Sequence, residues 1–211
     1  MPLIAVDGPA ASGKGTIARA LGRHFGVPHL DTGALYRAVA LAAMRAGLAL
    51  DDGKAMGAQA MALDLSLLED PELRGAAAGE AASRVSALPE VRAALLAFQK
   101  AFAAQPGGAV LDGRDIGTVI APEAQAKLFV TATAETRARR RFLELTSAGR
   151  DVAEERVLAD IVARDARDMG RADAPLRQAA DADLLDTSDL DIAAAVRQAV
   201  ELVSRRLDRI S

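Results

Sequence analysis

One loop near the amino terminus, residues 8–16, constrains the fold more than any other stretch of the chain. It reads Gly-Pro-Ala-Ala-Ser-Gly-Lys-Gly-Thr. The apolar run 3–6 before it predicts a short buried strand, and residues 17–25 after it carry apolar side chains at helical spacing. A strand, a Gly-x4-Gly-Lys loop and a helix in this order predict a phosphate-binding loop. Its glycines let consecutive N–H groups curl around an anion, and the positive end of the helix faces the same phosphates.

The loop predicts a nucleotide site. Lys14 is expected to reach the β- and γ-phosphates as a point charge. Gly15 stands where such loops usually carry a Mg²⁺-binding hydroxyl, so the ion should be held mostly by nucleotide phosphates and water. No Asn-Lys-x-Asp motif occurs, which argues against a GTPase. The residues expected to bind the nucleotide are Gly8, Pro9, Ala10, Ala11, Ser12, Gly13, Lys14, Gly15 and Thr16.

The composition limits the kinds of ligand and partner that the chain is expected to bind. Cysteine is absent, which excludes disulfides and thiolate metal sites. The net charge of −3 and the aromatic content of 3% disfavour binding to a nucleic-acid polymer or an anionic membrane. The chain runs straight into its first predicted strand, without the pattern of a signal peptide or a membrane span. We expect a cytoplasmic monomer that acts on small molecules.

Strand and helix patterns alternate along the 211 residues and predict a single α/β domain over residues 1–211. The expected strands are 3–6, 27–31, 109–112, 127–131 and 182–187. The expected helices are 17–25, 32–47, 79–87, 90–104, 135–145, 152–169 and 192–207, and residues 51–68 are expected to be helical and then extended. These elements predict a three-layer fold with a five-stranded parallel sheet covered by helices on both faces. The expected core is 1–31, 106–145 and 173–211, with a substrate-binding insertion at 32–105 and a lid at 146–172.

Two further patterns carry chemistry. Asp112 ends an apolar strand, where it would orient Mg²⁺ through a water, although a simple turn aspartate is the alternative. The arginines at 37, 92, 114, 164 and 171 lie in segments that can converge on the carboxyl edge of the sheet, and guanidinium groups suit phosphate. Most arginines of the helix 135–145 are instead expected to form a solvated basic face with an Arg140–Glu144 pair. Thr32 fits a helix N-cap as well as a ligand contact.

Several sequence blocks together resemble the bacterial-type cytidylate kinases, the CMP/dCMP kinases among P-loop nucleoside monophosphate kinases. The blocks are residues 7–16, 30–37, 81–86 with 91–92, 112–119 and 164–171. The resemblance implies transfer of the ATP γ-phosphate to CMP or dCMP, with Mg²⁺ as cofactor, giving ADP and CDP or dCDP. Residues 65–79 are shorter than the insert many members of that family carry, which leaves the affinity for CMP open.

The resemblance also implies roles for individual residues. Lys14, Asp112 and Arg164 would be catalytic, with Arg164 bridging substrate and lid. The implied cytosine and sugar contacts are Thr32, Ser83, Arg114, Asp115 and Asp168, and the implied α-phosphate or sugar contacts are Arg37, Arg92 and Arg171. Two alternatives remain: a kinase of another nucleoside monophosphate or small metabolite, and a catalytically weak ATP-binding regulatory module.

Overall fold

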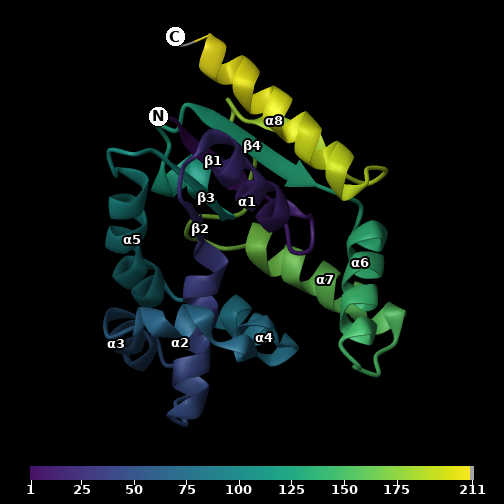
Figure 1. Ribbon diagram of the computed structural model, residues 1–211. Helices are drawn as coiled ribbons and strands as arrows, with labels where there is room; N and C mark the ends of the chain where they lie inside the picture. The colour runs from purple at the N-terminus through teal and green to yellow at the C-terminus, as the bar shows by residue number, and fades with distance from the viewer. Residues whose placement is uncertain (210–211) are drawn as a thin grey trace. The chain divides into compact units, whose positions relative to one another are not determined.

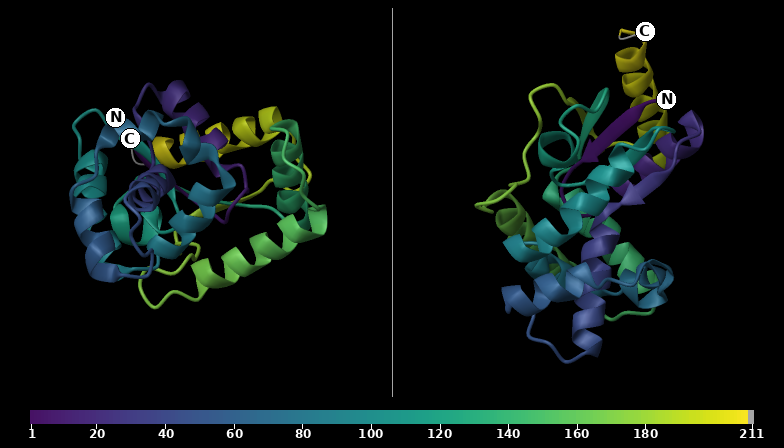
Figure 2. Two further views of the ribbon diagram at one scale, coloured as in Figure 1. Left: turned by 90° about the horizontal axis from the view of Figure 1, so that it is seen from below. Right: turned by 90° about the vertical axis from the view of Figure 1, so that its left-hand side faces the viewer.

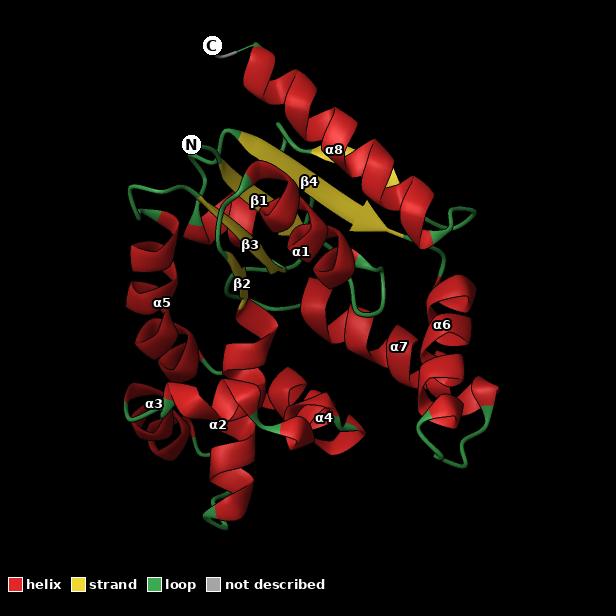
Figure 3. Ribbon diagram, viewed as in Figure 1, coloured by secondary structure: helices red, strands yellow, loops and turns green. Residues whose placement is uncertain are grey.

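The computed structural model describes residues 1–209 in two compact units, Met1–Leu30 with Gln105–Ser211 and Asp31–Ala104 (Figure 1). Residues 210–211, the last two of the predicted domain, lie outside the described residues. The first unit carries most of a parallel sheet with flanking helices, and the second is helical (Figure 3).

The sheet has five strands in the order β2-β3-β1-β4-β5. The strands are β1 (Leu3–Asp7), β2 (His29–Asp31), β3 (Ala109–Gly113), β4 (Ala126–Thr131) and β5 (Asp183–Asp186). β1 is central and pairs in parallel with β3 and β4, and β4 pairs in parallel with β5. Asp7 lies opposite Gly113, so β1 and β3 end side by side. The predicted α/β class with a five-stranded parallel sheet is confirmed.

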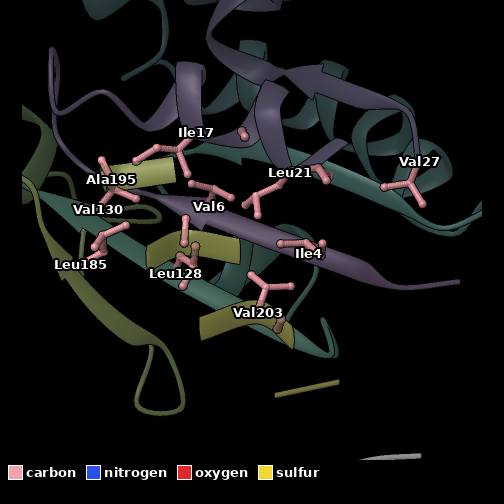
Figure 4. Close-up of a cluster of buried hydrophobic side chains, with 14 residues drawn as sticks. Ile4, Val6, Ile17, Leu21, Val27, Leu128, Val130, Leu185, Ala195 and Val203 are labelled. Atoms are coloured by element: carbon pink, nitrogen blue, oxygen red, sulfur yellow. The ribbon is translucent and has the colours of Figure 1, made fainter. Parts of the chain in front are cut away.

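Helices α1 (Lys14–Phe25) and α8 (Ile192–Asp208) pack against each other and against the sheet. The core between them is aliphatic, and Figure 4 shows its side chains. Ile4 and Val6 of β1, Leu21 of α1 and Val203 of α8 are all fully buried. Gly26 adopts a left-handed φ of 66° and its N–H donates to Gly22 O, which ends α1 where the sequence predicted.

Helices α6 (Ala134–Ser147) and α7 (Glu154–Met169) lie side by side, joined by a small apolar cluster around Ala138 and Ile161 (Figure 2). The predicted Arg140–Glu144 pair is wrong. Glu144 accepts from Arg141 at 2.7 Å, whereas Arg140 donates to Thr187 O at 2.6 Å. Thr133, the N-cap of α6, donates its N–H to Ser188 Oγ just after β5, so the helix lies where Thr187 O can bind this guanidinium.

The second unit consists of α2 (Thr32–Arg45), α3 (Gly53–Met61), η1 (Leu65–Glu69), η2 (Pro71–Arg74), α4 (Ala76–Val85) and α5 (Pro89–Ala103). Residues 65–69 form a 3₁₀ helix, so the predicted extended segment is wrong. Asp64 accepts from Ser66 N and caps this turn, a side-chain bond that competes with extension. Asp31, not Thr32, caps α2 by accepting from Ala34 N at 3.0 Å. Within residues 1–209, no helix combines the length and hydropathy of a membrane span.

Candidate active site

The loop between β1 and α1 adopts a backbone that few residues tolerate. A Cβ on Gly8 would lie 2.0 Å from Val130 O, so only glycine fits. Gly13 and Ala11 both have left-handed φ, of 88° and 58°. A left-handed alanine costs about 1 kcal/mol, so its surroundings must support it. Ala11 packs against the cluster that joins α6 and α7, which supplies that support.

The features around this loop fit the phosphates of ATP. Among residues 1–209, no side chain caps the amino terminus of α1, and the first turn of this helix has no acidic residue, so the partial positive charge there is available to an anion. Lys14 Nζ lies 3.3 Å from Pro9 O, folded over the loop. Ser12 Oγ is buried and has no hydrogen-bond partner among the described residues. A phosphate oxygen would satisfy this hydroxyl.

The loop is held from behind by side chains that the sequence analysis assigned elsewhere or missed. Arg137 is buried and donates to Ala10 O at 3.2 Å and to Asp165 of α7 at 2.6 Å. Thr187 Oγ1 donates to Ser12 O at 3.1 Å. The expectation of a solvated basic face is therefore wrong for Arg137. Nothing in its helical spacing distinguishes it from the neighbouring arginines.

Asp112 is the last residue but one of β3 and lies beside the phosphate loop. Its Oδ1 accepts a hydrogen bond from His29 Nε2 at 2.7 Å, and its Oδ2 lies 3.7 Å from the position of a Cβ on Gly15. Within residues 1–209, no group of three His, Cys, Asp or Glu side chains could hold a metal. One carboxylate facing the loop fits Mg²⁺ that is held by phosphates and water, with Asp112 acting through a water. The sequence did not indicate His29, because its partner depends on the strand order.

Asp168 binds two other predicted acceptor-binding residues. Arg114 Nε donates to its Oδ2 at 2.7 Å, and Arg171 donates to its Oδ1. Asp168 is only 1% exposed. Burial works to raise the pKa of its carboxyl, but the charges of Arg114, Arg171 and Arg164 outweigh burial and hold the pKa below its usual value. Asp168 is therefore an ionised acceptor at neutral pH.

Asp7, the last residue of β1, is a buried carboxyl that the sequence analysis did not select as a site residue. Its Oδ1 accepts from Ile116 N and its Oδ2 from Gly117 N, both at 2.8 Å. Burial raises its pKa to about 7, against the two backbone hydrogen bonds, which lower it. These amides directly follow Asp115, which is itself buried. The sequence signals for Asp7 were its place directly before the loop and at the start of the block 7–16.

Four predicted site residues belong to the second unit. Thr32 begins α2 and is buried, and Arg37 in the same helix donates to Asp31 Oδ2 at 2.7 Å. Ser83 of α4 has a buried Oγ without a hydrogen-bond partner among the described residues, as suits a ligand contact. Arg92 of α5 is buried.

Comparison with known proteins gives consistent results. A family model described as cytidylate kinase matches residues 4–205. Proteins named cytidylate kinase from Xanthobacter autotrophicus and a Bradyrhizobium species are 60% and 58% identical. The first match covers 97% of this chain and 98% of the relative, and the second covers 95% of each. A gluconokinase structure from Sinorhizobium meliloti 1021 matches with a TM-score of 0.57 at 17% identity, over 99% of this chain and 95% of that one, which supports the fold alone. This chain belongs to the cytidylate kinase family.

Proposed function

We propose that this chain transfers the γ-phosphate of ATP to CMP or dCMP, giving ADP and CDP or dCDP, in pyrimidine nucleotide metabolism. The observation that carries the proposal is 58–60% identity, over nearly the whole length, to proteins named cytidylate kinase. The phosphate loop accounts for the donor. The residues from Thr32 to Arg171 supply contacts for an acceptor that a simple ATP-binding module would not need.

The donor half of the reaction uses the loop and the start of α1. The N–H groups there and Lys14 bind the β- and γ-phosphates and stabilise the negative charge of the transferring group. The attacking oxygen belongs to the CMP phosphate and is already ionised, so no strong general base or covalent intermediate is needed. Asp112 would hold bound Mg²⁺ through a water, and the ion would supply charge neutralisation at the phosphates. Catalysis then rests on positioning and charge.

The acceptor half uses the predicted arginines and carboxylates. Cytosine has an amino group where uracil has a carbonyl. An ionised carboxylate accepts a hydrogen bond from the amino group of cytosine and repels the carbonyl oxygen of uracil. Asp168, ionised by its arginines, and Asp115 suit this choice. Thr32, Ser83 and Arg114 complete the base and sugar contacts. Arg37, Arg92 and Arg171 bind the α-phosphate or sugar, and Arg164 contacts the transferring group.

We also propose that separate segments of the chain bind the acceptor and close over the site. Residues 32–105 bind the acceptor, and residues 146–172 act as a lid that excludes water from the γ-phosphate. The left-handed Gly149 at the end of α6 suits a hinge. We place the reaction in the cytoplasm, where ATP is made and used. The exposed large apolar side chains are spread over many elements, which favours a monomer.

A coupled assay of ADP release tests the function, with CMP, dCMP, UMP, AMP and shikimate as acceptors. We expect CMP and dCMP to give the highest kcat/KM. Lys14→Ala serves as the control for contaminating kinases. Preference for another acceptor would replace the substrate assignment, and ATP binding without transfer to any acceptor would favour the regulatory module.

A further inference from the structure

We propose that Asp7 positions the acceptor-reading segment Arg114–Asp115, by accepting hydrogen bonds from the next two backbone amides, and so controls the use of CMP. The inference rests on the proposed function and assigns a role to a residue outside the predicted site. Asp7 is here a positioning residue that acts through Arg114 and Asp115.

Both oxygens of the Asp7 carboxylate accept a hydrogen bond from the backbone. Each oxygen of Asp7 takes one N–H, from Ile116 and Gly117, at 2.8 Å. These are the first two residues of η3 (Ile116–Ile120), a short π-helical turn, where backbone N–H groups lack partners within the helix. A Cβ on Gly117 would lie 3.1 Å from Lys127 Cδ and 3.4 Å from Asp7 Oδ2, so glycine allows the amide its close approach.

The backbone of Asp7 does not depend on its side chain. Asp7 pairs with Gly113 of β3 on one side and with Phe129 of β4 on the other. The phosphate loop that follows is held by this ladder and by contacts to Arg137 and Thr187. Removing the carboxylate charge should therefore disturb the segment Arg114–Gly117 and leave the ATP loop in place.

Burial of the Asp7 carboxylate costs free energy, because its charged form loses contact with water. Burial raises the pKa of Asp7 to about 7, and Asp115 raises it further by repulsion while Arg114 lowers it. Lys127 of β4, whose stem lies beside Gly117, directs its ammonium to Asp181 at 2.7 Å. An ionised carboxylate accepts from both amides better than a protonated one. The position of the acceptor-reading segment should thus improve as pH rises through 7.

Asp7→Asn tests the proposal. The asparagine side chain has the same shape as that of aspartate, but its NH₂ group is a donor and cannot accept a hydrogen bond from one of the two backbone amides. We expect KM for CMP to rise about tenfold or more, the equivalent of one lost charge-assisted hydrogen bond, and KM for ATP to change by less than about twofold. Asp183→Asn is the matched control. Asp183 also accepts two hydrogen bonds, from Arg206 at 2.7 Å each, at the opposite end of a strand.

The pH dependence separates positioning from a purely structural role. The ratio of kcat/KM for CMP, wild type over Asp7→Asn, should rise between pH 6 and pH 8 with a midpoint near 7. Ionisation of CMP itself cancels in this ratio. Equal changes in the KM of both substrates, or no change in either, would overturn the proposal, as would a ratio independent of pH.

Two further measurements test the role of Asp7 when the variant does not fold or when the acceptor is not CMP. If Asp7→Asn does not fold, the amide resonances of Ile116 and Gly117 in the unaltered chain should titrate together, and saturating CMP should lower their midpoint. An unchanged midpoint would contradict the proposal. If the wild type preferred another nucleoside monophosphate, the proposed function would fail, while the same comparisons with that acceptor would still decide the role of Asp7.

Discussion

Raising the pH from 5 to 8 should destabilise the folded chain through Asp7. Burial raises its pKa from 3.8 to about 7, so from pH 5 to about 7 the folded state holds a proton that the unfolded chain has lost. A group whose pKa is higher in the folded state than in the unfolded state stabilises the fold when it is protonated. This contribution is complete when the pH is below the pKa of the unfolded state, and it is lost as the pH rises through the pKa of the folded state. From these two values, the free energy of unfolding should fall by about 2.5 kcal/mol between pH 5 and pH 8.

The measurement compares wild type with Asp7→Asn, whose amide does not titrate. Urea unfolding followed by circular dichroism, at fixed ionic strength, gives the free energy of unfolding of both proteins at each pH. The difference, wild type minus variant, should decline by about 2.5 kcal/mol from pH 5 to pH 8, about 1 M in urea midpoint. Contributions of other groups cancel in that difference. A direct check is the ¹³C resonance of the Asp7 carboxyl, which should titrate near pH 7. A constant difference across the range would show that the carboxyl is ionised throughout and refute the reasoning.

Four other substitutions follow from the site. Lys14→Ala should lower kcat by at least about a hundredfold with an unchanged circular dichroism spectrum, because it removes charge at the γ-phosphate; near-normal turnover would contradict this role. Gly8→Ala should destabilise the chain by about 3 kcal/mol or prevent folding, because its Cβ would lie 2.0 Å from Val130 O, and an unchanged urea midpoint would count against the loop geometry. Gly15→Ser should fold normally, with Asp112 Oδ2 3.7 Å from its Cβ, and should shift the Mg²⁺ concentration for half-maximal activity; if that concentration is unchanged, Asp112 and position 15 do not face the ion. Asp168→Asn should raise KM for CMP about tenfold or more and leave KM for ATP nearly unchanged, and the opposite pattern in initial-rate kinetics would reverse the assignment.

The fold class and the family were predictable from the sequence, because their signals are short-range. Alternating strand and helix patterns predicted five parallel strands, and the structure has them in the order β2-β3-β1-β4-β5. The failures are the segment 65–69 of the second unit and the partners of Arg137 and Arg140 on α6. The segment 65–69 contains β-compatible apolar residues, yet the aspartate before it makes a local side-chain bond that forms a 3₁₀ turn.

The candidate site was predictable in part. The ion pairs of Asp168 with Arg114 and Arg171 bring three predicted residues together. Arg137 is buried and not solvated, and helical spacing is the same for a buried and a solvated arginine. His29 had no signal in the sequence, because its partner Asp112 lies on another strand.

By itself, the sequence determined the phosphate-loop motif and the end of α1 at Phe25, where Gly26 caps the helix. Both depend on the φ values that glycine permits and on residues close together in the chain. Only the tertiary structure decided which buried groups meet. Asp7 reaches Ile116 across 109 residues of sequence, and Arg137 reaches Ala10 across 127. Such contacts depend on strand order and helix packing, and the pKa of Asp7 depends on how deeply those elements bury it.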